Sequence, residues 1–407
     1  MEKNKLRKNF IWNMIGSTIN AFMSLFLMIL VTRINGLDQA GVFTFAFSLS
    51  CLLQVIGVFS GRAYQVTERD KKITDSDFIR NKTLTCFMML LVSFIYLGFH
   101  HYDLSKNLII ILLVFYKLLE AFAEVFYGII QKNGDLYKVG ISLSLKSVIS
   151  ILLFAIINIV TKNLIFAIFS IVFTQILILV LYDIRNANKY LVKTKANKSH
   201  VLLIMRGGVT IFIVTLLTQY VINAPKYAID SLSTNEIQTI YGIIAMPATI
   251  IILIGQFLIH PFLTKLSLLL KQKKMREFHQ VIFKMLVCIF LIGVVADFVA
   301  YLIGIPFLEL VYGVSLSKYK IDLLIIISGA SFYGMAYILS NALITMRDNT
   351  SQMIIFILVS ILSYFVSRYF VMKSALQGAS LSYLISMGIL LLFYFVYYII
   401  KKKRFER

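Results

Sequence analysis

The chain has 407 residues, of which 59% are hydrophobic and only 14% charged, and its mean hydropathy is +0.85. This composition excludes an ordinary soluble globular protein, in which about a quarter of the residues are charged. The three cysteines stand in or next to apolar runs at unrelated spacings, so they support neither a disulfide framework nor a zinc site.

Long apolar runs recur along the whole sequence. At a rise of about 1.5 Å per residue, runs of about 17 residues or more match a hydrocarbon core of about 30 Å. A transmembrane barrel would instead show alternating segments of about ten residues, which this sequence lacks. The basic N-terminus, MEKNKLRKNF, leads into an apolar run that is too long for a signal peptide and is followed by no small-residue cleavage site. We therefore predict an all-α polytopic membrane protein with an uncleaved first helix.

Hydropathy predicts twelve transmembrane helices. They cover residues 10–32, 41–64, 83–99, 108–130, 139–160, 164–184, 201–223, 237–260, 283–304, 321–345, 351–371 and 376–400. The third span is short, and only TKN separates the fifth from the sixth. We expect Pro247 to kink the eighth span, because its missing N–H and its ring disrupt the preceding turn.

The Lys and Arg residues predict the orientation. With the N-terminus inside, the inner segments hold 28 of the 40 basic residues and the outer loops only seven. Cytoplasmic loops carry such an excess, so both termini are predicted to be cytoplasmic. Most of the net charge of +21 is this signal, which also suits an anionic inner leaflet. We expect no nucleic-acid partner, because the basic residues are spread over seven loops without a recognition element.

A basic loop at residues 185–200 divides the chain into halves, 1–184 and 201–407, with six spans each. Equal halves of even span number indicate a parallel repeat, an arrangement in which many transporters place the substrate site at the interface. All loops are short, and the acidic DSD of Asp75–Asp77 is expected to be solvated in one of them. With no soluble domain to hold an active site, a transporter is favoured over an enzyme.

Charged residues interrupt the fourth span. Lys117, Glu120 and Glu124 fall within an arc of roughly 60° on one helix face. A charge at the centre of a spanning helix costs roughly 2.5 to 3.5 kcal/mol, so these groups need partners or water. Either they form a buried ion pair at helical spacing, or they face a wet cavity.

Other spans of the first half carry polar stripes of their own. These stripes include Asn20, Gln54 and Lys146, with Arg62 at the edge of one of them. Stripes of Ser and Gly serve equally well for close helix packing. On the alternative hypothesis Arg62, Lys117 and Lys146 line a cationic cavity, which would suit an anionic substrate.

The second half offers fewer signals. Arg206 begins the seventh span and Asp297 lies in the outer part of the ninth. An intramembrane carboxylate can bind a proton or a sodium ion, so such groups are candidates for coupling transport to an ion gradient. The histidines have no spacing suited to a metal, and we expect neither a metal nor a cofactor.

One stretch carries a family resemblance. The segment VTRINGLDQAGVFTFAFSLSCLLQVIG, which begins at Val31, resembles the junction of the first two spans in Wzx-like polysaccharide flippases of the MOP exporter superfamily. The family pattern is matched by Arg33, Gly36, Gly41 and Phe43. The frequent Pro after the first Gly of that pattern is replaced by Leu in this sequence.

A second stretch supports the same resemblance. IYGIIAMPATIIILIGQFLIHPFLTKLS, from Ile240, is similar to the eighth-span segment of these flippases, including Pro261 after the span. The resemblance implies two six-helix bundles in a V-shaped transporter whose central cavity alternates between the two membrane faces. It also implies movement of undecaprenyl-pyrophosphate-linked oligosaccharide units to the outer leaflet for capsule or O-antigen-like polymers.

The resemblance assigns expected roles to the polar residues. Cationic cavity residues in such proteins meet the pyrophosphate and anionic sugars, since paired charges attract strongly at low dielectric. The expected substrate contacts are Arg62, Lys117, Lys146, Arg206, Asn20 and Gln54, and the expected ion-coupling groups are Glu120, Glu124 and Asp297.

Three alternatives stay open. A drug/cation antiporter of the same superfamily would favour an acidic cavity, and a polysaccharide polymerase or membrane glycosyltransferase would need a long outer loop or a soluble catalytic segment. A structural scaffold requires that the polar stripes be dry packing faces. The flippase reading predicts a bacterial plasma membrane location, lipid-linked oligosaccharide as substrate, and a polymerase with chain-length machinery as partners.

Overall fold

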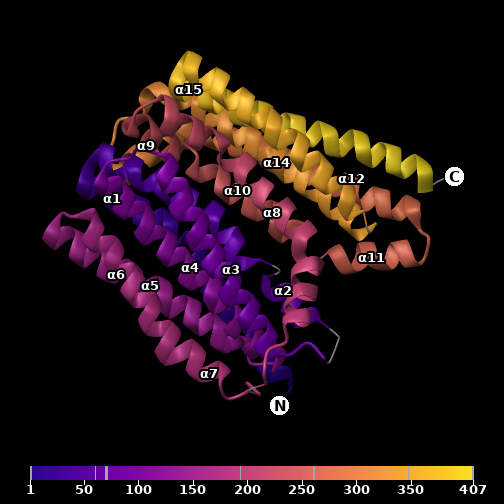
Figure 1. Ribbon diagram of the computed structural model, residues 1–407. Coiled ribbons are helices and arrows are strands. Elements are labelled where there is room, and N and C mark those ends of the chain that lie inside the picture. The colour runs from indigo at the N-terminus through magenta and orange to yellow at the C-terminus, as the bar shows by residue number, and fades with distance from the viewer. Residues whose placement is uncertain are drawn as a thin grey trace. The chain divides into compact units, whose positions relative to one another are not determined.

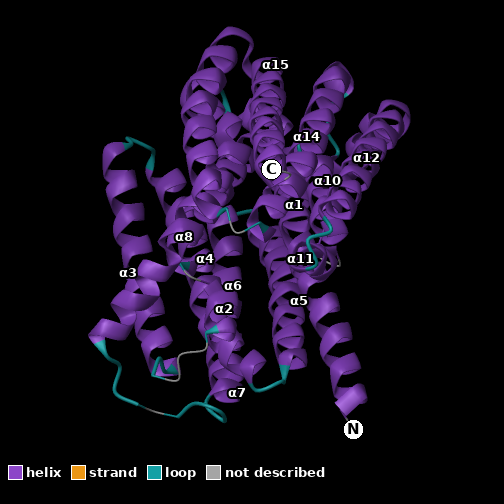
Figure 2. Ribbon diagram, turned by 90° about the vertical axis from the view of Figure 1, so that its right-hand side faces the viewer, coloured by secondary structure: helices purple, strands orange, loops and turns teal. Residues whose placement is uncertain are grey.

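A computed structural model describes residues 2–59, 61–68, 72–192, 194–259, 262–346 and 348–405. These residues are almost entirely helical and contain no strand (Figure 2). Within them, nine helices are long and apolar enough to cross a membrane, and two of the nine, Asn4–Val58 and Thr350–Lys402, each contain two predicted spans. The helix through residues 104–132 contains one further predicted span. The predicted all-α, multi-pass membrane fold is confirmed.

The first compact unit is Met1–Leu216. Its elements are α1 (Glu2–Val58), α2 (Gly61–Thr67), α3 (Asp75–Phe99), α4 (Leu104–Lys132), α5 (Leu136–Thr161), α6 (Leu164–Ile178), the π-helical η1 (Leu179–Ile184), α7 (Arg185–Ala187) and the first part of α8 (Lys198–Leu232). α1 packs along α5 and α4, and α6 lies beside α5 (Figure 1). α4 also contacts α2, α3 and α6, so it is the central helix of this unit.

Two glycines shape α1. Gly36 joins its two predicted spans in a non-helical conformation, with φ 82° and ψ 178°, which only glycine adopts without strain. Gly16 lies where α1 crosses α5: a Cβ added there would come 2.2 Å from the carbonyl oxygen of Gly140. A Cβ added at Gly140 would come 2.1 Å from the carbonyl oxygen of Trp12. The two backbones therefore approach so closely that no side chain fits at either position.

The third span is longer than predicted. α3 begins at Asp75 rather than residue 83, because Thr74 and Asp77 form a capping box. Asp77 also accepts a hydrogen bond from the Asn197 backbone nitrogen at 2.7 Å and contacts His200 Nδ1 at 3.1 Å. Its side chain is only 1% exposed, so the prediction of a solvated acidic loop is wrong for Asp77. This residue instead ties the segment before α8 to the start of α3.

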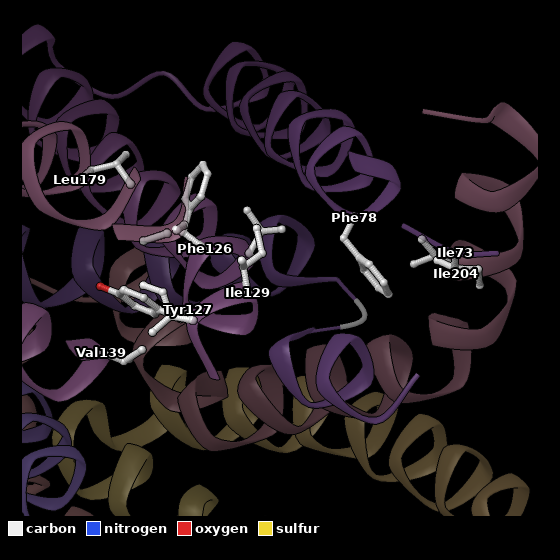
Figure 3. Close-up of a cluster of buried hydrophobic side chains, with 12 residues drawn as sticks. Ile73, Phe78, Phe126, Tyr127, Ile129, Val139, Leu179 and Ile204 are labelled. Atoms are coloured by element: carbon white, nitrogen blue, oxygen red, sulfur yellow. The ribbon is translucent and has the colours of Figure 1, made fainter. Parts of the chain in front are cut away.

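A buried apolar cluster joins the elements around the end of α4. It consists of Ile73, Phe78, Ala123, Val125, Phe126, Tyr127, Ile129, Ile130, Val139, Leu179, Ala187 and Ile204. Figure 3 shows Ile204 of α8 next to Ile73, and Tyr127 of α4 close to Val139 of α5. The cluster therefore fixes α3, α4, α5 and the start of α8 against one another by burying apolar surface.

The second compact unit is Leu217–Arg407. After the rest of α8 it contains α9 (Asn235–Ile244), α10 (Met246–Ile259), α11 (Leu263–Lys271), α12 (Met275–Val299), the π-helical η3 (Ala300–Gly304), α13 (Ile305–Tyr312), the 3₁₀ helix η4 (Ser317–Tyr319), α14 (Lys320–Thr345) and α15 (Asn349–Phe405). α14 packs against α10, α12 and α15 (Figure 1). The unit boundary lies within α8, whereas the domain boundaries expected from the sequence lie at 185–200.

Several helix breaks in the second unit follow from local sequence. The eighth predicted span is interrupted at Ala245, two residues before Pro247, which confirms the predicted break in this span. The last two predicted spans meet in α15, where Ser374 and Ala375 leave the helical conformation. One expectation is wrong: the segment between the eighth and ninth predicted spans, expected to be a loop, contains α11 and the first turns of α12.

Candidate functional site

The polar face of α4 holds an ion pair. Lys117 Nζ lies 2.7 Å from Glu120 Oε2, and the two side chains are 10% and 17% exposed. Tyr116 donates to Glu120 Oε1 at 2.8 Å, and Gln54 Nε2 donates to Glu120 Oε2 at 3.2 Å. The Lys117 ammonium also lies 4.8 Å from the ring centre of Phe47. The structure therefore brings together three of the predicted site residues, with Glu120 as the shared acceptor.

A second ion pair lies further along the same face. Arg62 of α2 places Nε 3.5 Å from Glu124 Oε2, and the side chains are 28% and 29% exposed. Arg62 Nη1 is buried and makes no hydrogen bond to a described residue. Arg62 thus uses one edge of its guanidinium for Glu124 and keeps donor capacity for another acceptor. This pair is the more open of the two.

The position of α2 depends on a buried lysine. Lys82 of α3 donates to the carbonyl oxygens of Gly57 at 3.0 Å and Val58 at 2.6 Å, the last turn of α1. A cation at the end of a helix satisfies carbonyls that lack intrahelical partners and suits the helix dipole. Sequence analysis counted Lys82 among the cytoplasmic loop charges, which is wrong, because its side chain is buried. Lys82 instead fixes the chain just before Arg62.

Lys146 has a different environment. Its ammonium lies 2.6 Å from Asp183 Oδ2, and the side chains are only 3% and 0% exposed. Lys146 also donates to the Tyr127 hydroxyl at 2.9 Å, and that hydroxyl lies 3.1 Å from Ser142 Oγ. The assignment of Lys146 as a substrate contact stays a prediction, but its surroundings are those of a closed ion pair. Nearby on α5, Ser147 donates to the predicted site residue Asn20 at 3.2 Å.

Arg206 lies on α8 and is exposed. One residue further, a Cβ added at Gly207 would come 2.7 Å from the Tyr64 hydroxyl of α2. The rings of Phe212 and Phe59 lie 4.8 Å apart between centres. α8 therefore packs beside the segment that carries Arg62, so these two predicted cationic residues come from neighbouring elements.

In the second unit, Asp297 accepts a hydrogen bond from Ser328 at 2.9 Å through one carboxylate oxygen. Its other oxygen, Oδ1, is buried without a described hydrogen-bond partner. The same holds for Oδ1 of Asp322 on α14, whose side chain is buried. A buried carboxylate oxygen without a donor is costly, which makes both residues candidates for binding a proton or a cation.

The charges of the site are balanced. Each of the three cations of the first unit that were predicted to line a cavity, Arg62, Lys117 and Lys146, lies within 3.5 Å of a carboxylate oxygen. The described contacts of these residues are thus the ion pairs that the sequence analysis named as one of two possibilities, and their role toward a substrate stays a prediction. No group of three or more His, Cys, Asp or Glu side chains suited to a metal occurs among the described residues.

Sequence reasoning missed two of these carboxylates. Asp183, at the end of the sixth predicted span, and Asp322, at the edge of the tenth, received no role. A signal for Asp183 exists: it follows Leu179 by four residues, and Leu179 follows Gln175 by four, so an extended helix puts all three on one face. The structure extends that helix as the π-helical η1. Two other residues of interest, His260 and Pro261, lie outside the described residues.

Comparisons with known proteins place these features in context. No family model matches the sequence. The chain is 26% identical over 401 residues to the capsular polysaccharide biosynthesis protein CapF of Staphylococcus aureus, covering 96% of this chain and 98% of CapF. It is similar in structure to the lipid II flippase MurJ in an inward closed conformation, with a TM-score of 0.74 and 14% identity over 96% of this chain and 89% of MurJ.

MATE transporters show the same architecture. The bent form of Vibrio cholerae VcmN aligns with a TM-score of 0.62 and 12% identity, over 99% of this chain and 98% of VcmN. An inward-facing MATE family transporter of the MOP superfamily aligns with a TM-score of 0.64 and 15% identity, over 100% of this chain and 96% of that protein. The chain has the fold of the MOP transporters. This result confirms the predicted multi-pass membrane fold and agrees with the resemblance predicted from the two sequence stretches.

Proposed function

We propose that this MOP-fold protein is a flippase for lipid-linked oligosaccharides. It moves undecaprenyl-pyrophosphate-linked repeat units from the inner to the outer leaflet of a bacterial plasma membrane, for capsule or O-antigen-like polysaccharide. One observation carries this proposal: similarity to a capsular polysaccharide biosynthesis protein and a transporter fold coincide over almost the whole chain. A transporter in such a pathway needs a substrate, and the lipid-linked oligosaccharide is the intermediate that has to move across the membrane.

The geometry of Arg62 supports recognition of a pyrophosphate. A guanidinium offers several donors in a planar fork, which matches phosphate oxygens, and Arg62 has Nη1 without a described hydrogen-bond partner. Its contact with Glu124 is long, at 3.5 Å, and about a quarter of each side chain is exposed. An incoming phosphate can therefore replace Glu124 as the partner of Arg62.

That exchange suggests how transport is coupled to an ion gradient. When a phosphate occupies Arg62, Glu124 loses its cation and becomes able to bind a proton or Na⁺. Lys117 and Glu120 are held more tightly, at 2.7 Å and with hydrogen bonds from Tyr116 and Gln54. In this scheme the Arg62–Glu124 pair separates when substrate binds, whereas the Lys117–Glu120 pair stays intact.

The proposal is tested by leaflet transfer in proteoliposomes. Purified undecaprenyl-pyrophosphate oligosaccharide is followed by its accessibility to a membrane-impermeant glycosidase. Wild type should transfer it, and Arg62→Gln should slow transfer about 10- to 100-fold, the loss of a charge-assisted hydrogen bond worth roughly 1.5–3 kcal/mol. Lys189→Gln is the matched control, because Lys189 is exposed and donates to a side chain of its own turn, Asn186, at 3.3 Å.

Drug/cation antiport is the second candidate, and similarity to MATE transporters favours it. The same proteoliposomes can be loaded with ethidium under an imposed proton or sodium gradient. Ethidium exchange without oligosaccharide transfer would replace the flippase proposal by the antiporter. Lengthening of the oligosaccharide during the assay would instead indicate a polymerase.

A further inference from the structure

The second unit has an open apolar groove on the surface of its helices. The groove has a volume of about 510 Å³ and is formed by α12, α14 and α15. Its walls include Phe283 and Phe290 of α12 and Leu392 of α15, which are 66%, 52% and 55% exposed, while Leu339 of α14 forms a buried floor. Such a surface within a spanning segment suits a hydrocarbon chain.

A basic pocket adjoins this groove. The pocket has a volume of about 670 Å³ and is lined by Arg276, His279, Gln280, Phe283, Lys284 and Lys402. Phe283 belongs to both, so the apolar groove and the basic pocket are continuous. None of the described residues that line the pocket is acidic, and the nearby Glu277 pairs with Lys274 at 3.4 Å outside it.

The groove and the basic pocket together have the depth of one leaflet. From His279 in the pocket to Phe290 at the far end, α12 rises by about 16 Å at about 1.5 Å per residue. This is about half of a hydrocarbon core of about 30 Å. The lining residues of α14 and of the last predicted span, 376–400, reach Phe332 and Gly388, which lie near the middles of these spans.

We propose that the groove and the adjoining basic pocket bind one anionic glycerophospholipid of the inner leaflet. The phosphate lies among Arg276, Lys284 and Lys402, and an acyl chain lies between α12, α14 and α15. Charge decides the occupant: the pocket attracts an anionic headgroup at the membrane surface, whereas a zwitterionic one gains no net attraction. The site is formed by residues of the second unit alone and does not depend on the proposed flippase activity.

Gly388 gives access to the groove for mutagenesis. A Cβ added there would meet only the Phe332 ring, at 3.7 Å, which is ordinary van der Waals contact. Gly388→Leu therefore fills the groove without forcing the helices apart. The double variant Lys284→Gln with Arg276→Gln removes two cations from the pocket. Lys274→Gln is its control, because it removes a cation at the start of α12 that does not line the pocket.

Quenching by brominated lipids tests the site. Trp12 is the single tryptophan of the chain, so Trp12→Phe with Phe395→Trp places one reporter in the groove wall. We compare brominated phosphatidylglycerol with brominated phosphatidylcholine in vesicles of the full chain. The anionic lipid should be preferred several-fold, and Lys284→Gln with Arg276→Gln should bring the preference close to one, because each cation near the surface contributes about 1 kcal/mol. Lys274→Gln should keep the preference, and Gly388→Leu should reduce quenching by both lipids.

Three results would overturn the proposal. Equal quenching by the two lipids would show that the pocket does not select charge. A preference unchanged in Lys284→Gln with Arg276→Gln would place the selection elsewhere. Displacement of the brominated lipid by equimolar undecaprenyl phosphate would assign the groove to a polyprenyl chain. Each variant is first checked for monodispersity and thermal unfolding in detergent, so that a loss of quenching is read only from folded protein.

Discussion

Lys146 of α5 and Asp183 of η1 form an ion pair of 2.6 Å in which neither side chain is appreciably exposed. The Tyr127 hydroxyl completes the arrangement by accepting from Lys146 at 2.9 Å. Because such charges lose their hydration on burial, each needs the other in order to stay in the structure. This pair joins the fifth and sixth spans of the first unit through a carboxylate to which the sequence analysis gave no role.

Removing one member of this pair should destabilise the protein strongly. We expect Asp183→Asn or Lys146→Met to cost about 3–5 kcal/mol, because the remaining charge is buried without a counterion. The double variant Lys146→Met/Asp183→Leu should recover most of that loss. Thermal unfolding in detergent measures each variant. Single variants as stable as wild type would show that the pair is not closed to water.

Close backbone contact should make Gly140 intolerant of substitution. A Cβ there would lie 2.1 Å from the carbonyl oxygen of Trp12, so Gly140→Ala has to push α1 and α5 apart. We expect a loss of about 1–3 kcal/mol or more, as for an overpacked core. Gly98→Ala of α3 is the matched control, since nothing lies within 4 Å of its added Cβ, and it should be neutral or slightly stabilising. Equal melting temperatures for the two variants would argue against the close crossing.

Asp77 should control the order of the segment before α8. It holds the Asn197 backbone nitrogen at 2.7 Å and contacts His200 at 3.1 Å. Asp77→Ala removes these bonds, so the segment should open more often and trypsin should cleave at Lys195 about ten times faster. Asp75→Ala, two residues away, leaves both bonds in place and should cleave at the wild-type rate. If both variants cleave alike, Asp77 does not anchor the segment.

Asp348 should make the second unit sensitive to acid. Partial burial opposes the ionisation of Asp348. However, Lys401, Ser351 and Tyr397 each donate a hydrogen bond of 2.7 Å to its carboxylate oxygens. These bonds outweigh the effect of burial and hold the pKa of Asp348 well below its usual range. The stabilisation is therefore complete above the pKa of the unfolded chain, about 3.9, and is lost as the pH falls through the lower native value.

Replacing Asp348 tests this assignment. At pH 7, Asp348→Asn should melt below wild type, because it loses the charged partner of Lys401. The difference between the two melting temperatures should begin to shrink as the pH is lowered from 5 to 3, because the unfolded wild-type chain then takes up a proton on this carboxyl while the folded protein keeps its charge. A difference that stays constant over this range would mean that the carboxylate charge contributes nothing.

Much of the transmembrane fold could be predicted from the sequence. The sixth predicted span, 164–184, coincides with α6 and η1. The break predicted from Pro247 occurs at Ala245, in the turn that precedes the proline. Inside a bilayer every backbone polar group has to be paired within the helix, so the length of an apolar run determines the helix. The ends are less certain, because caps such as that of Thr74 lie outside the apolar runs.

The candidate site could be predicted only in part. Lys117, Glu120 and Glu124 were visible because a charge is rare in a spanning helix and the helical turn places all three on one face. Their partners were not visible. Gln54, Arg62 and Asp183 reach α4 or α5 from other helices, and a single sequence contains no record of which helices pack together.

The sequence by itself therefore determined that the chain is a helical membrane protein with charged groups in its spans, since hydropathy and the helical period are local properties. Only the tertiary structure decided which charges neutralise one another. It closed Lys146 against Asp183 and left Arg62 with a long contact to Glu124 and a buried Nη1 without a described partner. The physical reason is that the cost of a buried charge depends on the few ångströms around it, and those are set by packing between helices distant in the chain.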